Sequence, residues 1–151
     1  MSVASGSMRE VLAVLERCLE TPIVPGELEL WLKESRAAVE QAQTLLSQEL
    51  SERHPELLAE IEENCPELTP HLEQIRAGDR SSSEMLRCLQ GRLLALTLRF
   101  VHGEPDEQRA DGDLGAVIAA GLRFVIHART QEVAIETWLT ESLGRDHGTV
   151  D

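Results

Sequence analysis

The sequence is poor in aromatic side chains, which make up 3% of its 151 residues and include no tyrosine. The four aromatic residues are Trp31, Phe100, Phe124 and Trp138. Because strands draw heavily on aromatic and β-branched residues, a core built mainly from leucine favours helices over sheets. Few aromatics also means few of the side chains that usually anchor protein–protein contacts.

Basic residues are outnumbered by acidic ones. The chain has 14 lysines and arginines against 27 aspartates and glutamates, which gives a net charge of −13. This balance argues against non-specific nucleic-acid binding, which depends on basic residues that neutralise phosphates. It argues equally against docking on an anionic membrane surface, so we expect neither nucleic acid nor membrane as a partner.

Cysteine is scarce, and long apolar runs are missing. Cys18, Cys65 and Cys88 are odd in number and have no C-x-x-C spacing, which predicts neither a disulfide framework nor a zinc site. The longest uncharged apolar stretch, residues 114–122, is shorter than the ~20 residues needed to cross a bilayer. The first residues show no pattern of a secretory signal. We therefore expect a cytoplasmic protein with reduced thiols.

Motifs that announce catalysis or cofactor binding are also missing. The Glu-x-x-His pairs of metal-carboxylate bundles do not occur, and the pair Glu67 and His71 has a different spacing in a proline-rich stretch. The sequence contains no His-Glu-x-x-His, P-loop, Gly-x-Gly-x-x-Gly or Gly-x-Ser-x-Gly motif. The sequence therefore predicts no catalytic residues, no metal site and no cofactor.

What the sequence does contain is a series of amphipathic segments. The first begins with a capping-box pattern at Ser7–Glu10 and stops at residues 21–26, which hold two prolines and a glycine. The second, residues 28–53, carries leucines and other apolar side chains on one face at helical spacing. We expect it to end at His54, because Pro55 disfavours a helical conformation of the residue before it.

The middle of the chain is less regular. We expect short helical pieces between residues 55 and 77, with Gly78 ending them. A capping box at Ser81–Glu84 then predicts the start of another long helix, with Gly103 as its C-cap. Residues 94–101 alternate apolar and polar side chains as a strand would, but a helical stripe that starts about ten residues earlier favours a helix.

The last helix should follow a loop at residues 103–112 and be capped by Asp113. Residues 114–128 are apolar on nearly all sides, which predicts a central helix. We expect frayed tails at residues 1–6 and 145–151. Together the segments predict one all-α domain over residues 1–151. It is an antiparallel bundle of four to five helices, with short capping helices between the second and fourth long segments.

Acidic residues are concentrated between Glu49 and Glu73, where eight of them and one basic residue give a net charge of −7. Such a stretch can simply be a solvated surface that keeps a leucine-rich protein soluble. The functional hypothesis is a docking face for a protein partner with a basic segment, because a concentrated field speeds association. The candidate docking residues are Glu52, Glu56, Glu60 and Glu63, together with Trp31 on the second helix.

A second candidate site comes from a repeated string, in which residues 98–102 resemble residues 122–127. Each copy holds an arginine and a histidine that share one face of a helix. These side chains can lie at helix edges, with the arginine stems covering apolar surface. Alternatively, they line a pocket for a small anionic ligand between the last two long helices. The candidate pocket residues are Arg99, His102, Arg123 and His127.

These features predict a non-enzymatic protein–protein interaction module, such as an adaptor, a regulator or a chaperone-like protein. It would use the acidic face and an apolar helix groove. Two alternatives stay open: a small-molecule sensor or carrier with the pocket described above, and an acidic decoy that mimics nucleic acid. A homodimer also stays open, because small residues such as Gly115 and Ala119 let another helix approach closely.

Overall fold

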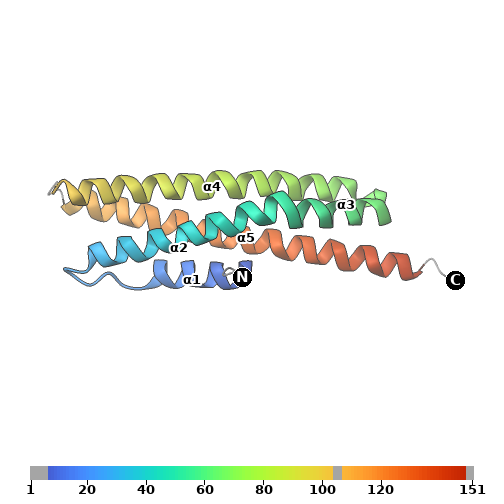
Figure 1. The fold of residues 1–151 in the computed structure, drawn as a ribbon, viewed down its shortest axis with the longest axis horizontal. Coiled ribbons are helices and arrows are strands. Elements are labelled where there is room, and N and C mark those ends of the chain that lie inside the picture. The colour runs from blue at the N-terminus through green and yellow to red at the C-terminus, as the bar shows by residue number, and fades with distance from the viewer. Residues whose placement is uncertain (1–6, 104–106, 149–151) are drawn as a thin grey trace.

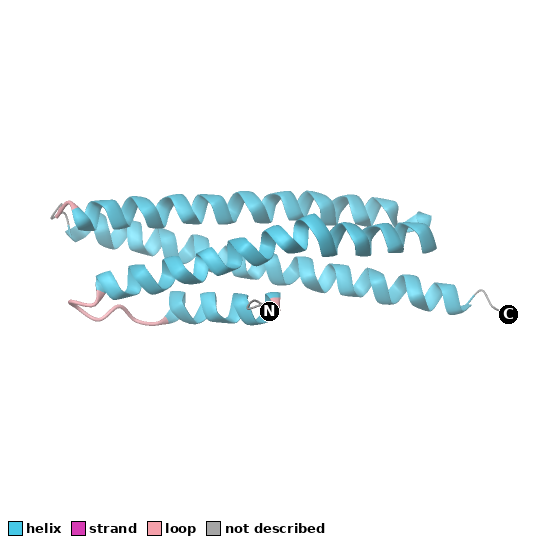
Figure 2. Cartoon of the chain, in the orientation of Figure 1, coloured by secondary structure: helices cyan, strands magenta, loops and turns pink. Residues whose placement is uncertain are grey.

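The computed structural model describes residues 7–103 and 107–148, which are almost entirely helical (Figure 2). A π-helical segment joins α2 to α3, and a short 3-10 helix precedes α4. The described residues contain no strand, so the predicted all-α bundle is confirmed and residues 94–101 are helical. The elements are α1 (Met8–Glu20), α2 (Leu28–Gln48), η1 (Glu49–Arg53), α3 (His54–Asn64), η2 (Pro66–Leu68), α4 (Thr69–Val101) and α5 (Glu107–Gly148).

The long elements run antiparallel along one axis (Figure 1). α2, η1 and α3 follow one another without a break and form a rod, which we call the α2–α3 rod. α4 returns along this rod, and α5 returns along α4. α1 is much shorter and packs against α2 and α5, so it covers only one half of the bundle.

Two separate apolar cores result from this arrangement. In the first, buried residues of α1, α2, α4 and α5 pack together, among them Leu15, Ala42, Leu89 and Phe124. The second lies beyond the end of α1, where α3, η2, α4 and α5 meet. Its members are Leu58, Ile61, Cys65, Leu68, Leu72, Ile75 and Ile135.

The first helix follows its sequence pattern closely. Ser7 is the N-cap of α1, and its hydroxyl accepts a hydrogen bond from the Glu10 N–H at 3.3 Å, as predicted. The opposite end is joined to α2 by the indole of Trp31, which donates to the Cys18 carbonyl at 3.0 Å. Trp31 is only 6% exposed and belongs to the first core, so it is not part of an open docking face.

The boundary predicted at His54 is present, because η1 ends at Arg53 and α3 begins at His54, but the expected end of the helical rod is wrong: the chain continues helically through Pro55. The His54 N–H donates to the carbonyl of Glu49, five residues earlier, which is the π-helical pattern. Proline has no N–H and normally breaks a helix by leaving one carbonyl without a donor. Just before Pro55 the backbone hydrogen bond already spans five residues instead of four, so the helical rod continues past the proline.

The predicted helix end at Gly78 and the predicted start at Ser81–Glu84 are also wrong. α4 begins at Thr69 and passes through both positions. Gly78 has a packing role instead, because the side-chain amide of Gln131 on α5 lies against its backbone. A Cβ atom at position 78 would come within 2.2 Å of Gln131 Oε1. The glycine therefore leaves room for the Gln131 amide, which its hydrogen bonds to Ile75 and Asp79 hold in place, and it does not end the helix.

The last helix also differs from its prediction. Gly103 ends α4 with a positive φ of 67°, as expected, and residues 104–106 of the predicted loop lie outside the described residues. α5 begins at Glu107, so Asp113 is inside the helix and pairs with Arg99 of α4. α5 is not buried on all sides, since Ile126 is 64% exposed.

The two predicted tails are described only in part. α5 extends to Gly148, well into the predicted C-terminal tail at 145–151. Residues 1–6 and 149–151 lie outside the described part of the chain. Within the described residues, no helix combines the length and the apolar character that crossing a membrane would require.

Substituting the two glycines of α4 that differ in packing tests the close approach of α5. Gly78→Ala should lower the free energy of unfolding by about 1–3 kcal/mol, because the new methyl group overlaps Gln131. Gly91→Ala is the matched control in the same helix: nothing lies within 4 Å of its added Cβ. It should stabilise the protein by about 0.5–1 kcal/mol through helix propensity. Urea unfolding followed by circular dichroism measures both, and equal effects would contradict the prediction.

Candidate functional site

A layer of polar and charged side chains separates the two apolar cores. It lies where the α2–α3 rod passes through its π-helical segment, opposite the middle of α4 and α5. The rod contributes Glu49, Arg53 and His54, α4 contributes Asp79, and α5 contributes Gln131 and Glu132. We call these six residues the polar layer.

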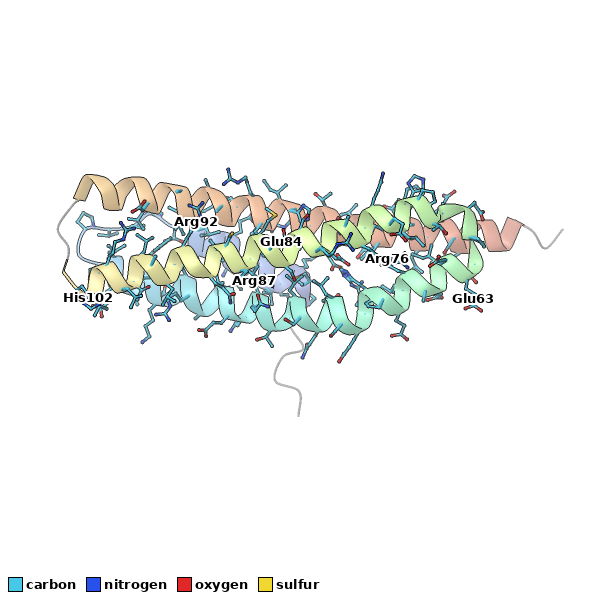
Figure 3. The ribbon with its side chains drawn as sticks, turned by 90° about the horizontal axis from the view of Figure 1, so that it is seen from above. Glu63, Arg76, Glu84, Arg87, Arg92 and His102 are labelled. Carbon is cyan, nitrogen blue, oxygen red and sulfur yellow. The ribbon has the colours of Figure 1, made fainter. Side chains whose placement is uncertain are left out.

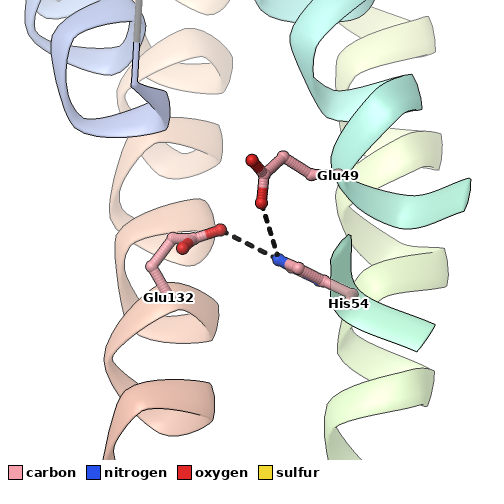
Figure 4. Close-up of side chains that lie close together, drawn as sticks. All are labelled: Glu49, His54 and Glu132. Carbon is pink, nitrogen blue, oxygen red and sulfur yellow. Dashed lines mark hydrogen bonds and ion pairs between the residues drawn. The ribbon is translucent and has the colours of Figure 1, made fainter. Parts of the chain in front are cut away.

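His54 is the centre of the polar layer and is only 2% exposed. Its Nδ1 atom lies 2.9 Å from Asp79 Oδ2, and its Nε2 atom lies 2.9 Å from Glu132 Oε1. The carboxylate of Glu49 is 3.5 Å from the same Nε2 atom (Figure 4). A neutral imidazole has a single N–H, which would leave its other nitrogen facing a carboxylate without a proton between them. The geometry therefore fits a doubly protonated, positively charged ring.

The charges of this layer stabilise one another. Burial by itself would lower the pKa of His54, but hydrogen bonds and charge attraction from Asp79 and Glu132 outweigh it and raise the pKa from 6.5 to about 9. Burial acts in the opposite direction on Glu132 and raises its pKa. The hydrogen bond and charge of His54, with the charge of Arg53, reverse this and leave the pKa below its ordinary value.

Arg53 and Gln131 also form hydrogen bonds within the layer. Arg53 Nη1 donates to Glu49 Oε2 at 2.6 Å and to Glu132 Oε2 at 3.0 Å. Gln131 Nε2 donates to the Ile75 carbonyl at 2.8 Å and to Asp79 Oδ1 at 3.0 Å. Every helix of this region thus contributes to one connected network, which offsets the cost of burying its charges.

This layer could not be predicted from the sequence, for a geometric reason. Glu49 and His54 are five residues apart, and on an α-helix such side chains point about 140° apart. In the π-helical turn the backbone hydrogen bond joins residues five apart, which brings Glu49 and His54 onto one face of the rod. The remaining partners come from distant parts of the chain. The available signal was the interruption of apolar stripes by His54, Asp79 and Gln131, which are all polar.

Two clefts reach the polar layer from outside. One, of about 560 Å³, opens beside the first turn of α1 and is lined by Ser7, Arg9, Glu49, Arg53 and Glu132 among others. The other, of about 470 Å³, lies between the rod and α4 and is lined in part by His54 and Asp79. Arg76 and Arg87 line this second cleft on the face of α4 beside the rod (Figure 3). Small solutes and ions can therefore reach the layer.

Among the residues that the structure describes, Glu49, His54 and Glu132 form a group that could hold a metal ion. Each offers one ligand atom, and the three atoms lie within 4.8 Å of one another. Carboxylate oxygen and imidazole nitrogen are common ligands of divalent metal ions. Such an ion would have to replace the positive charges that Arg53 and the His54 ring supply in this structure.

The predicted arginine–histidine pocket is not assembled in the structure. Arg99 pairs with Asp113, while His127 Nε2 donates to the Gly78 carbonyl at 2.8 Å. Asp113 and His127 are separated by about 21 Å along the axis of α5, at 1.5 Å per residue. Arg123 and His102 are exposed, the latter at the end of α4. The four side chains therefore share no cavity.

The predicted acidic face, in contrast, is open to solvent. Glu52 lies in η1 and Glu56, Glu60 and Glu63 lie in α3, and all four are exposed. We call these four residues the acidic row. Among the described residues, no ion pair involves any of them. Figure 3 shows Glu63 at the edge of the bundle, pointing away from it.

A scan against protein-family models finds no matching family, and searches of curated proteins and of solved structures find no similar chain. The polar layer and the acidic row are thus the two features of the molecule from which a function can be proposed.

The protonation of His54 can be measured directly. In protein freed of metal ions by a chelator, both ring nitrogens of His54 should carry protons at pH 7, with a midpoint of about 9. Because the folded-state pKa lies above the ordinary value of 6.5, the associated stability is complete below pH 6.5 and is lost as the pH rises through about 9. Nitrogen–proton NMR spectra of the imidazole follow the titration.

The variant His54→Gln assigns the imidazole signals to His54, because they should be missing from its spectrum. The free energy of unfolding of the wild type should fall more between pH 6.5 and 9.5 than that of this variant. A single ring proton on His54 at pH 7 would contradict the predicted charge.

Proposed function

We propose that this chain is a non-enzymatic protein-binding module that docks a basic segment of a partner protein on the acidic row. The observation that carries the proposal is the uncompensated state of Glu52, Glu56, Glu60 and Glu63. Nearby acidic residues are neutralised within the chain: Glu62 and Glu73 both pair with Arg76. The acidic row has exposed carboxylates and no such partner among the described residues.

The spacing of the row supports a binding role. From Glu56, its members follow at intervals of four and three residues, so their charges lie close together on one face of α3. Like charges at this spacing destabilise a helix by a few tenths of a kcal/mol per pair. Lysines or arginines of a partner would remove this repulsion, and the concentrated field would speed their approach.

An apolar groove farther along the same rod supplies a second contact surface. It lies between the first turns of α2 and the last turns of α4 and encloses about 400 Å³. Phe100 and Val101, which line it, are 43% and 70% exposed. The groove ends at Glu40, about 18 Å before Glu52 along the rod. The partner that fits both surfaces is an amphipathic helix with basic residues at one end.

Binding of a lysine-rich helical peptide tests the proposal. The peptide carries a fluorescent label, and its anisotropy reports affinity at low and high salt. Replacing all four members of the acidic row by glutamine should weaken binding by about fourfold or more, since each exposed charge pair contributes about 0.2–1 kcal/mol. The same variant should show a weaker dependence of affinity on salt.

A control variant changes the net charge by the same amount elsewhere. It replaces Glu10, Glu20, Glu27 and Glu34, which are exposed on or beside α1 and α2, by glutamine. Its affinity should stay within about twofold of the wild type, because none of these charges lies on η1 or α3, which carry the row. Equal losses in both variants would show that only net charge matters and would overturn the proposed docking site.

A further inference from the structure

We propose that Glu49, His54 and Glu132 form a binding site for a divalent transition-metal ion of the zinc type, with Asp79 positioning the imidazole. The site is distinct from the acidic row and does not depend on the function proposed for it. The three ligand residues come from η1, α3 and α5, so an ion bound there would connect the rod to α5 at the junction of the two cores.

The distances around His54 suit a metal ion. Zinc binds nitrogen and carboxylate oxygen at about 2.0–2.2 Å, which places neighbouring ligand atoms about 3.0–3.5 Å apart. His54 Nε2 lies 2.9 Å from Glu132 Oε1 and 3.5 Å from Glu49 Oε2. All three ligand atoms lie within 4.8 Å of one another, so side-chain movements that draw them closer would place them around one ion (Figure 4).

The outer partner of the imidazole is already in place. Asp79 Oδ2 is 2.9 Å from His54 Nδ1, and Asp79 Oδ1 accepts a hydrogen bond from Gln131 at 3.0 Å. A carboxylate that accepts the Nδ1 proton fixes the tautomer and directs the Nε2 lone pair at the ion. This is the arrangement found around many metal-binding histidines.

The charges balance when a dication replaces the two cations now in the layer. Binding of the ion removes one proton from His54, which passes to solvent, and releases Arg53 from Glu49 and Glu132. The two lost positive charges equal the charge of the ion, so the burial of the three carboxylates stays compensated. Arg53 can leave because its side chain is 41% exposed and lines the cleft beside α1.

The same cleft gives the ion access and room for water ligands. Glu49, Arg53 and Glu132 all line it, next to Ser7 at the start of α1. Three protein ligands leave at least one position open, which water fills. One imidazole among the ligands favours zinc over magnesium and calcium, which prefer sites made only of oxygen atoms.

Isothermal titration of the chelator-treated full chain with zinc tests the site. We expect one zinc ion per chain, no competition by millimolar magnesium, and affinity at least tenfold weaker in Glu132→Gln and in Asp79→Asn. Glu136→Gln is the matched control, because Glu136 lines the same cleft one turn farther along α5 and is not among the three ligands. Its affinity should equal that of the wild type.

Arg53→Met separates a metal site from a purely structural ion-pair network. It keeps all three ligands and removes the competing guanidinium, so zinc should bind about fivefold tighter or more. Unchanged or weaker binding in this variant overturns the proposal, and it decides alone if Glu132→Gln or Asp79→Asn does not fold. Cobalt gives a second check: a thiolate charge-transfer band would place the ion on the cysteines and also overturn the site.

Discussion

The charged ring of His54, held between Asp79 and Glu132, is the interaction on which the middle of this bundle depends. Its two hydrogen bonds of 2.9 Å tie the α2–α3 rod to both α4 and α5. A buried charge is costly unless every partner is present, so the three helices must meet in one arrangement. The leucine-rich cores on either side are less demanding, because apolar side chains of similar size can exchange neighbours at modest cost.

Several features that look irregular along the chain serve this arrangement. The π-helical segment turns Glu49 and His54 onto one face and absorbs Pro55. Gly78 lets the amide of Gln131 lie against the backbone of α4, where it bonds to the Ile75 carbonyl and to Asp79. The end of α1 leaves a cleft through which Glu49, Arg53 and Glu132 are reached. A proline, a glycine and a short first helix thus act together at one level of the bundle.

The sequence predicted the parts of the fold that follow from local chemistry. The Ser7 cap, the break at residues 21–26, the apolar face of α2 and the Gly103 stop all agree with the structure. The predictions failed where proline or glycine was taken as a helix end, at Pro55 and Gly78. At Gly78 a contact with α5 decides the outcome, and local propensity cannot include it. At Pro55 the π-helical hydrogen bond from His54 to Glu49 keeps the chain helical. The exposed acidic row could be read from spacing, whereas the polar layer could not.

The all-α antiparallel bundle and the acidic surface on its third helical segment thus follow from local sequence patterns. Helical periodicity, caps and charge are properties of neighbouring residues, and they need no knowledge of the rest of the chain. The meeting of His54, Asp79 and Glu132, the separation of Arg99 from His127 and the burial of Trp31 became visible in the three-dimensional fold alone. These outcomes depend on the register between helices, which packing of the two cores and the pairing of buried charges set together.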